Sequence, residues 1–272
     1  MAPFETIILD KDPSTHIARI TFNRPEKLNA ITGQMLSELG SAVDDIASDD
    51  EMRVLIITGS GRGFCAGADI GGLGSGQDGP HSPTQDADAI RRSFKAAQRV
   101  ILGLHKMEKP TIAMVNGVAA GAGCDIACAC DLRIGSFNSR FVSSYIRIGL
   151  FPGYGGTWLY ARALGSVAKA AEFLFTGDPL EAQEAERHGL LNKLVPAERL
   201  EDTTMELAQK IASGPPIAIR LGKMLLYKGL DMDLETAMQM AAAAESITLK
   251  SADHSEGVAA FQGKRGARFK GS

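Results

Sequence analysis

Residues Val54 to Asp69 read VLIITGSGRGFCAGAD, an apolar run that opens into a loop of small residues. Residues Thr111 to Asp125 read TIAMVNGVAAGAGCD and repeat the arrangement. Each apolar run has the length and composition of a buried strand, and the glycines after it are typical of a tight connection. Short apolar strands that alternate with helices predict an α/β fold. This pattern alone favours a doubly wound sheet.

The rest of the chain supports an α/β body followed by a helical region. A strand is expected over His16–Phe22, and Thr32 is placed to cap a helix that runs to Ile46. Helical spacing returns at 91–105, a further strand is expected at 132–135, and the chain reads as mostly helical from 157 onward. We expect a body over residues 1–200 and a helical C-terminal region over 201–272.

Composition and charge exclude several classes of protein. The chain has 272 residues and a net charge of −3, which does not favour nucleic acid or an acidic membrane as a partner. The N-terminus, MAPFETIILD, lacks the apolar core of a signal peptide, so we expect a cytoplasmic protein. Cys124 and Cys128 have helical spacing but no nearby histidine, which favours buried small side chains over a metal site.

Two glycine patterns in the chain imitate phosphate-binding motifs. Gly74-x-Gly76-x-x-Gly79 matches the dinucleotide pattern but follows no expected strand and runs into Pro80. Gly59-x-Gly61-x-Gly63 does follow a strand, but its spacing is wrong and no Lys-Ser/Thr pair comes after it. We therefore expect no nucleotide site at either place.

The loops at 63–69 and 116–125 favour a different kind of site. At a helix start, backbone N–H groups lack partners inside the helix. Two such groups that converge on one point form an oxyanion hole, and each donor contributes about 3–4 kcal/mol to the transition state. The alternative is that the glycines only allow close packing of a helix on a strand, and each loop taken alone favours that alternative.

Five segments, taken in order and spacing, resemble the enoyl-CoA hydratase/isomerase (crotonase) superfamily. They are ITFNRPEKLNA at 20–30, VLIITGSGRGFCAGAD at 54–69, the segment 109–131, GLFPGYGGT at 149–157 and EGVAAFQGKRGARFKG at 256–271. The resemblance covers essentially the whole chain. It implies a spiral of ββα units with a helical C-terminal region, in place of the doubly wound sheet, and a homotrimer or a dimer of trimers.

The resemblance also implies an acyl-CoA substrate, with no resident cofactor because coenzyme A enters with the substrate. By position, the oxyanion donors fall on the N–H groups of Ala66 and Ala122. The residues expected along CoA are Lys27, Leu28, Ala30, Ala68, Asp69, Ile70, Phe261 and Lys264, the last two in the same or an adjacent subunit.

The catalytic positions depart from the family's hydratase pattern, which has two glutamates. Here the first position is Asp125 and the second is Tyr145. Hydration of a 2-enoyl-CoA needs water activated and a proton delivered, whereas a 1,3-proton shift needs one base that accepts and returns a proton. One-base isomerisation fits these residues better. Isomerase relatives often have an aspartate where this chain has Gly153, which weakens that comparison.

Structural roles are expected for several neighbouring side chains. Tyr154 and Trp158 are expected in the pocket wall or the core, Asp69 as a loop-fixing acceptor, and Asp131 as a cap or ion-pair partner. His81 lies in the Gly- and Pro-rich segment after Asp69.

Two further activities stay open: hydrolysis or C–C cleavage of a CoA thioester, and a non-catalytic RNA-binding role, which the acidic net charge disfavours.

Overall fold

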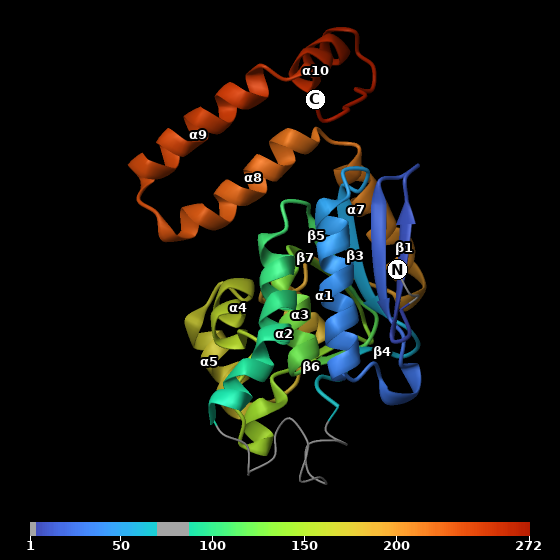
Figure 1. Cartoon of the computed structure of the whole chain (residues 1–272), viewed down its shortest axis with the longest axis vertical. Coiled ribbons are helices and arrows are strands. Elements are labelled where there is room, and N and C mark those ends of the chain that lie inside the picture. Colours follow the sequence, from blue (N-terminus) through green and yellow to red (C-terminus); the bar gives the residue numbers. More distant parts are fainter. Residues whose placement is uncertain (1–3, 70–86) are drawn as a thin grey trace.

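The computed structural model describes residues 4–69 and 87–272, and its strands form two sheets (Figure 1). The larger sheet has the order β1 (Ile7–Asp12), β2 (Ile17–Phe22), β3 (Val54–Gly59), β5 (Thr111–Val115), β7 (Leu132–Ser136) and β10 (Lys193–Val195). The smaller sheet has the order β4 (Gly63–Cys65), β6 (Val118–Ala120), β8 (Arg140–Val142) and β9 (Leu180–Glu181). Among the strands of the described residues, the β1–β2 and β8–β9 pairs are antiparallel and the other pairs are parallel.

The helices connect and cover these strands. In the body they are α1 (Gly33–Ser48), α2 (Ala87–Lys106), α3 (Ala122–Ala129), α4 (Gly156–Ala163), α5 (Val167–Thr176), α6 (Ala182–Arg187) and α7 (Leu200–Ala212). The C-terminal helices are α8 (Pro216–Lys228), α9 (Leu234–Leu249) and α10 (Ala252–Gln262). Single 3-10 turns are η1 (Pro25–Lys27), η3 (Ser144–Ile148), η4 (Ala197–Arg199) and η5 (Gly229–Asp231).

The body repeats one unit, in which a strand of the large sheet leads to a short strand of the small sheet and then to a helix. The successive units are β3-β4-α2, β5-β6-α3 and β7-β8-α4, and like strands pair in parallel. The predicted spiral of ββα units is therefore confirmed, and the doubly wound sheet is wrong. The three-residue strands are too short to give a period-2 pattern, so strand periodicity alone cannot reveal them.

Apolar side chains on both faces of the large sheet explain its position in the core. Every residue of β3 is buried, as expected for a strand covered on both faces. One face packs with α1, α2 and α3 in the main core, and the other face packs under α7 (Figure 1). The predicted boundary at residue 200 stays a prediction, although α7 packs against the sheet of the body.

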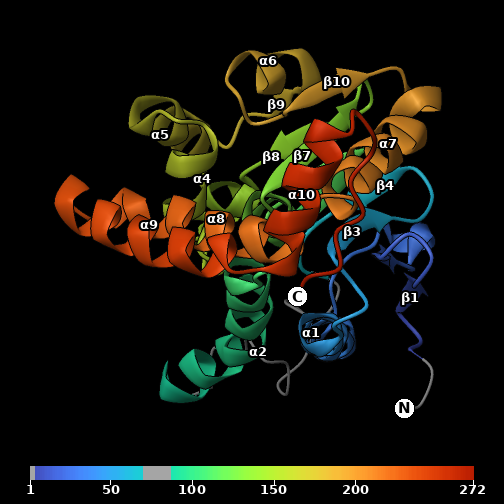
Figure 2. The same cartoon turned by 90° about the horizontal axis from the view of Figure 1, so that it is seen from above.

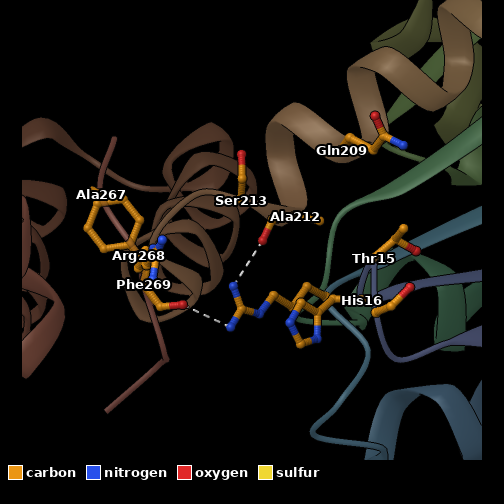
Figure 3. Close-up of a pocket in the computed structure, with 10 residues that line it drawn as sticks. Thr15, His16, Gln209, Ala212, Ser213, Ala267, Arg268 and Phe269 are labelled. Atoms are coloured by element: carbon orange, nitrogen blue, oxygen red, sulfur yellow. Dashed lines mark hydrogen bonds between the residues drawn. The ribbon is translucent and has the colours of Figure 1, made fainter. Parts of the chain in front are cut away.

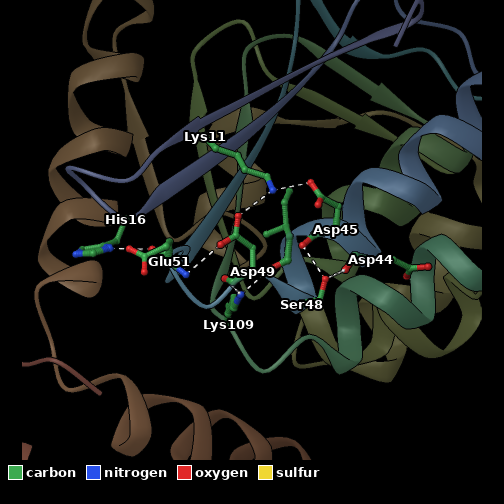
Figure 4. Close-up of polar contacts among 9 residues, drawn as sticks. Lys11, His16, Asp44, Asp45, Ser48, Asp49, Glu51 and Lys109 are labelled. Atoms are coloured by element: carbon green, nitrogen blue, oxygen red, sulfur yellow. Dashed lines mark hydrogen bonds and ion pairs between the residues drawn. The ribbon is translucent and has the colours of Figure 1, made fainter. Parts of the chain in front are cut away.

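Helix α1 shows how local sequence and tertiary contacts fix an element together. The predicted cap is confirmed, because Thr32 Oγ1 accepts a hydrogen bond from the Met35 N–H at 3.1 Å. At the other end the Lys109 ammonium donates to the Ile46 carbonyl at 2.6 Å and also to that of Asp49, while Lys11 pairs with Asp49 at 2.8 Å (Figure 4). Lys109 thus satisfies carbonyls at the negative end of the helix, and Lys11 neutralises the carboxylate of the capping residue Asp49.

Helices α8 to α10 form an arm that extends beyond the body, with α8 and α9 packed side by side (Figures 1 and 2). The arm is attached through Asp131, which accepts from Lys223 Nζ at 2.7 Å and from the Tyr227 phenol at 2.7 Å. His105 lies between the rings of Tyr227 and Trp158, with centroid distances of 4.7 and 4.9 Å. The structural role expected for Asp131 is thus confirmed.

The C-terminal tail returns to the body at a pocket beside the β1–β2 turn (Figure 3). Arg53 donates to the Ala212 carbonyl and to the Phe269 carbonyl, both at 3.0 Å, and so ties the tail to the end of α7. None of the residues that line this pocket is one of the predicted site residues. Among the residues described, no helix is long and apolar enough to cross a membrane.

Candidate active site

The two glycine-rich loops meet at the start of α3. Gly121 adopts a left-handed backbone (φ 49°) and immediately precedes the helix, while Gly67 in the other loop also has a positive φ of 93°. A Cβ built on Gly67 would lie 2.8 Å from the Ala120 oxygen and 3.6 Å from the Ala122 nitrogen. These glycines therefore allow the two backbones to approach at van der Waals distance.

The Ala122 N–H is placed where the sequence predicted a donor. Ala122 is the first residue of α3, so it has no partner inside the helix. Within residues 4–69 and 87–272, its N–H has no other hydrogen-bond partner. The helix dipole adds positive potential at the same point.

The prediction for Ala66 is wrong in this structure, because its N–H already donates to the Leu28 carbonyl at 2.9 Å. Two residues further on, Ala68 forms a parallel bridge with Ile31. The Gly67 carbonyl and the Asp69 N–H both bond to Ile31, at 2.8 and 2.9 Å, so the N–H of Ala68 points to the opposite side of the strand. In the described part of the chain this N–H has no acceptor.

Asp125 projects from the first turn of α3, is fully buried, and accepts one hydrogen bond on each carboxylate oxygen. The Tyr145 phenol donates to Oδ2 at 2.6 Å, and the Tyr160 phenol donates to Oδ1 at 2.5 Å. The structure therefore brings together the two residues that were predicted as catalytic. It adds Tyr160, which the sequence reasoning did not identify.

A sequence signal for Tyr160 exists in hindsight, in the Gly155-Gly156 pair that begins α4. A Cβ on Gly156 would lie 2.7 Å from Asp125 Oδ1 and 2.8 Å from the Tyr160 ring. Gly156 therefore allows the carboxylate and the phenol to pack against the helix backbone. Tyr160 follows Gly156 by four residues, which places both on one face of α4.

Burial sets the protonation of the cluster. It raises the pKa of Asp125 from 3.8 to about 6, although the hydrogen bonds from Tyr145 and Tyr160 act in the opposite direction. Burial raises the pKa of both phenols far above the usual value, and the neighbouring Asp125 charge adds to this. At neutral pH the cluster therefore holds one ionised carboxylate between two protonated phenols.

The N-terminal part of the expected CoA region lies beside the loops. Leu28 has a positive φ of 50°, and its carbonyl accepts from the Ala66 N–H. The Ala30 N–H donates to the Lys27 carbonyl at 3.1 Å, so both residues belong to the same turn. The Asp69 carboxylate accepts from Arg24 Nη1 at 3.0 Å, which confirms its expected loop-fixing role. Ile70, His81 and the 74–79 glycine pattern lie outside the described residues.

The remaining predicted positions lie elsewhere. Phe261 is 87% exposed at the end of α10, and Lys264 follows it with a φ of 49°; α10 lies at the end of the molecule opposite β4 and β6 (Figure 1). Neither residue reaches the Asp125 site of its own chain. Trp158 is 40% exposed under Arg162 and beside His105, so its placement in the core is wrong, and its placement in a pocket wall stays a prediction.

Cys65, Cys124, Cys128 and Cys130 are free thiols, and all four are buried. Burial raises the pKa of Cys65 and of Cys130 to about 12, so these two stay neutral. Their surroundings are those of small core side chains, as the spacing favoured.

Comparison with known proteins places this geometry in a family. The profile described as "Enoyl-CoA hydratase/isomerase" matches residues 12–272. A crotonyl-CoA hydratase of Syntrophomonas wolfei is 38% identical over 98% of both chains, and a 1,2-epoxyphenylacetyl-CoA isomerase of Escherichia coli is 35% identical over 94% of this chain and 95% of its own. A crystal structure of an enoyl-CoA hydratase from Bacillus anthracis has a TM-score of 0.89 at 32% identity, covering 98% of this chain and 100% of that one. The chain therefore belongs to the enoyl-CoA hydratase/isomerase family of enzymes.

Proposed function

We propose that the protein moves the double bond of an unsaturated acyl-CoA by a 1,3-proton shift. The observation that carries this proposal is the buried carboxylate of Asp125, both of whose oxygens accept hydrogen bonds from phenols. One ionised base beside two protonated donors suits a reaction in which a proton is taken from one carbon and returned to another.

The thioester carbonyl is proposed to bind between the N–H groups of Ala122 and Ala68. Both N–H groups lack acceptors within the described residues, and the loops that carry them are in contact through Gly67. Donors so placed stabilise the oxyanion that forms when the α-carbon loses its proton, by about 3–4 kcal/mol for each donor. Ala68 thus takes the role that the sequence assigned to Ala66.

Asp125 is proposed to remove the α-proton of a 3-enoyl-CoA and to return it at the γ-carbon. The electrons of the broken C–H bond form the dienolate, whose oxygen is held by the two N–H groups. Protonation at the γ-carbon then gives the conjugated 2-enoyl product and restores the carboxylate. The reaction needs no resident cofactor, since coenzyme A enters with the substrate.

Hydration of a 2-enoyl-CoA is the second candidate, because two of the relatives are named as hydratases of short-chain enoyl-CoA and crotonyl-CoA. Hydration requires one group to activate water and a second to deliver a proton to the α-carbon, whereas Asp125 accepts hydrogen bonds only from phenols in this cluster. The need for a second acid–base group favours isomerisation.

The two activities are separated by following ultraviolet absorbance of the conjugated thioester. Isomerisation predicts a gain of signal from 3-enoyl-CoA, and hydration predicts a loss of signal from 2-enoyl-CoA. Loss of the 2-enoyl signal without any gain from the 3-enoyl substrate would refute the isomerase proposal. A thiol reagent added in parallel detects free CoA, which would indicate thioester hydrolysis instead.

We also propose that the arm packs on other copies of the chain, in a trimer or a dimer of trimers. Helix α9 has no buried residue, and several of its apolar side chains are more than half exposed. Exposed apolar side chains gathered on one helix in this way are typical of an interface. In such an assembly Phe261 and Lys264 would reach the CoA of a neighbouring subunit, which their distance from their own site allows.

A further inference from the structure

The two oxygens of the Asp125 carboxylate have different surroundings. Oδ1 accepts from Tyr160, whose side chain is 1% exposed and belongs to the main core. Oδ2 accepts from Tyr145, which is only partly buried and lies on η3. A Cβ built on Gly121 would lie 3.9 Å from the Tyr145 phenol oxygen, so the phenol that donates to Oδ2 lies next to the residue that directly precedes the proposed donor Ala122.

Packing on three sides holds the Tyr160 phenol in place. Its ring meets that of Phe173 edge to face, with a centroid distance of 5.1 Å and an interplanar angle of 76°. The backbone of Gly156 closes a second side, where no Cβ would fit. The carboxylate itself occupies the third. A buried ring constrained in this way has few alternative rotamers, so its hydrogen bond to Oδ1 has a fixed direction.

We propose that Tyr160 is a positioning residue that holds Oδ1 of Asp125 toward the core and leaves Oδ2 as the atom that exchanges a proton with the substrate. The inference deepens the proposed function and rests on it. It divides the two phenols by role: Tyr160 fixes the orientation of the carboxylate, and Tyr145 lies at the oxygen that faces the reaction.

The ionisable groups around Asp125 make this role measurable by pH. The hydrogen bond from Tyr160 lowers the pKa of Asp125 and so offsets part of the effect of burial. Burial raises the pKa of Tyr154 and of Cys124, and the nearby Asp125 charge raises both further. Both groups therefore stay neutral while Asp125 titrates. Because Asp125 must be ionised to act as a base, activity falls at low pH as Asp125 is protonated; this part of the pH–activity profile is its acidic limb. Loss of the Tyr160 hydrogen bond should move the acidic limb to higher pH.

The test is the pH profile of kcat/KM for Tyr160→Phe, which removes one oxygen atom and keeps the ring. We expect the acidic limb to move upward, kcat to fall roughly 10- to 100-fold as for loss of one hydrogen bond to a charged group, and KM to stay within about twofold. An unchanged acidic limb together with unchanged kcat would overturn the proposal. Incorporating 3-fluorotyrosine at position 160 gives a stronger hydrogen-bond donor, and the acidic limb of the pH profile should then move to lower pH.

Tyr227→Phe is the matched control, since it removes a phenol that donates to the Asp131 carboxylate at 2.7 Å where the arm meets the body. It should lower the melting temperature without moving the acidic limb. A limb that moved equally in both variants would show a general effect of stability and would overturn the proposal.

The reaction that the wild-type protein catalyses distinguishes a failure of this inference from a failure of the proposed function. All profiles are measured with whichever enoyl-CoA the wild type converts. A wild type that hydrates but does not isomerise would refute the isomerase proposal, while the shift of the limb in Tyr160→Phe would still support the positioning role of Tyr160.

Discussion

At the scale of single residues, the ionisation of Asp125 links activity to stability. Burial raises its pKa in the folded chain to about 6, against 3.8 in its absence. Between these values the folded state binds more protons than the unfolded state, so the free energy of unfolding decreases as the pH rises through this window. At neutral pH the buried charge costs about 3 kcal/mol, since one pKa unit corresponds to 1.4 kcal/mol.

Asp125→Asn should therefore lose activity without losing stability. We expect kcat to fall by about 100-fold or more, because the base is absent. The melting temperature at about pH 8 should equal or exceed that of the wild type, because no charge is buried. Steady-state assays and thermal unfolding check both parts, and CoA affinity should be unchanged. A variant with full activity would refute Asp125 as the base.

Tyr145→Phe tests whether its phenol takes part in the chemistry or only lines the pocket. Its hydrogen bond to Asp125 Oδ2 stabilises the carboxylate, so its loss should lower kcat roughly tenfold and move the acidic limb of activity upward. The pH profile of kcat is the measurement. An unaltered pH profile with an unaltered kcat would show that Tyr145 only lines the pocket and takes no part in proton transfer.

At the scale of elements, the active site depends on how closely α3 packs on β4. A Cβ on Gly123 would lie 2.3 Å from the Cys65 carbonyl oxygen, a backbone atom that cannot move aside. Gly123→Ala should therefore push α3 away from β4, reduce the free energy of unfolding by about 1–3 kcal/mol, and lower activity by separating the two donor loops.

Gly222→Ala is the control for this substitution, because a Cβ at that position of α8 would meet nothing within 4 Å. It should stabilise the chain by about 0.4–1 kcal/mol, with activity unchanged. Chemical denaturation of both variants measures the difference. Equal stability of Gly123→Ala and the wild type would contradict the packing argument.

The arm depends on a largely buried ion pair where α8 meets the body. Lys223 and Asp131 have side chains that are 8% and 14% exposed, and Lys223 also donates to the Lys109 carbonyl at 3.0 Å. Lys223→Met would leave the Asp131 charge without a cation and should cost about 2–4 kcal/mol, slightly below a fully buried pair. Lys228→Met, at an exposed position of the same helix, should change the stability by less than about 0.5 kcal/mol.

Urea denaturation at neutral pH compares the two lysine variants. Loss of the Lys223 contact should also make the arm more accessible to proteases than it is in Lys228→Met. Equal stability of the two variants would mean that the ion pair does not hold the arm.

At the scale of the whole molecule, the arm carries an apolar surface that the chain does not cover itself. Leu234 and Met238 of α9 are 76% and 63% exposed. Replacing both with glutamate should dissociate the proposed oligomer, because like charges would then have to be buried in the interface. Sedimentation velocity measures the change, and Gln239→Glu on the same helix is the control.

The same variant tests whether a neighbouring subunit completes the CoA site. If Phe261 and Lys264 serve the adjacent chain, dissociation should weaken CoA binding as well. A dissociated variant with the CoA affinity of the wild type would show that the two residues do not contribute. A wild type that sediments as a monomer would refute the proposed assembly itself.

The sequence alone predicted the features that depend on neighbouring residues. Thr32 caps α1 because its hydroxyl reaches an N–H three residues away, and β3 is buried because every one of its residues is small or apolar. The order of the motifs identified the family and its spiral of ββα units, and it located Asp125 and Tyr145. All of these are properties of a short window, or of a series of windows read in order.

Tertiary structure decided which atoms remain free to act. The Ala66 N–H is taken by Leu28, a residue distant in sequence, so the free donor of that loop is Ala68. Tyr160 reaches Asp125 only because Gly156 lets α4 approach α3, and Phe261 lies far from its own site because the arm extends outward. A hydrogen bond between distant segments depends on how their backbones approach, and local sequence patterns do not specify that distance.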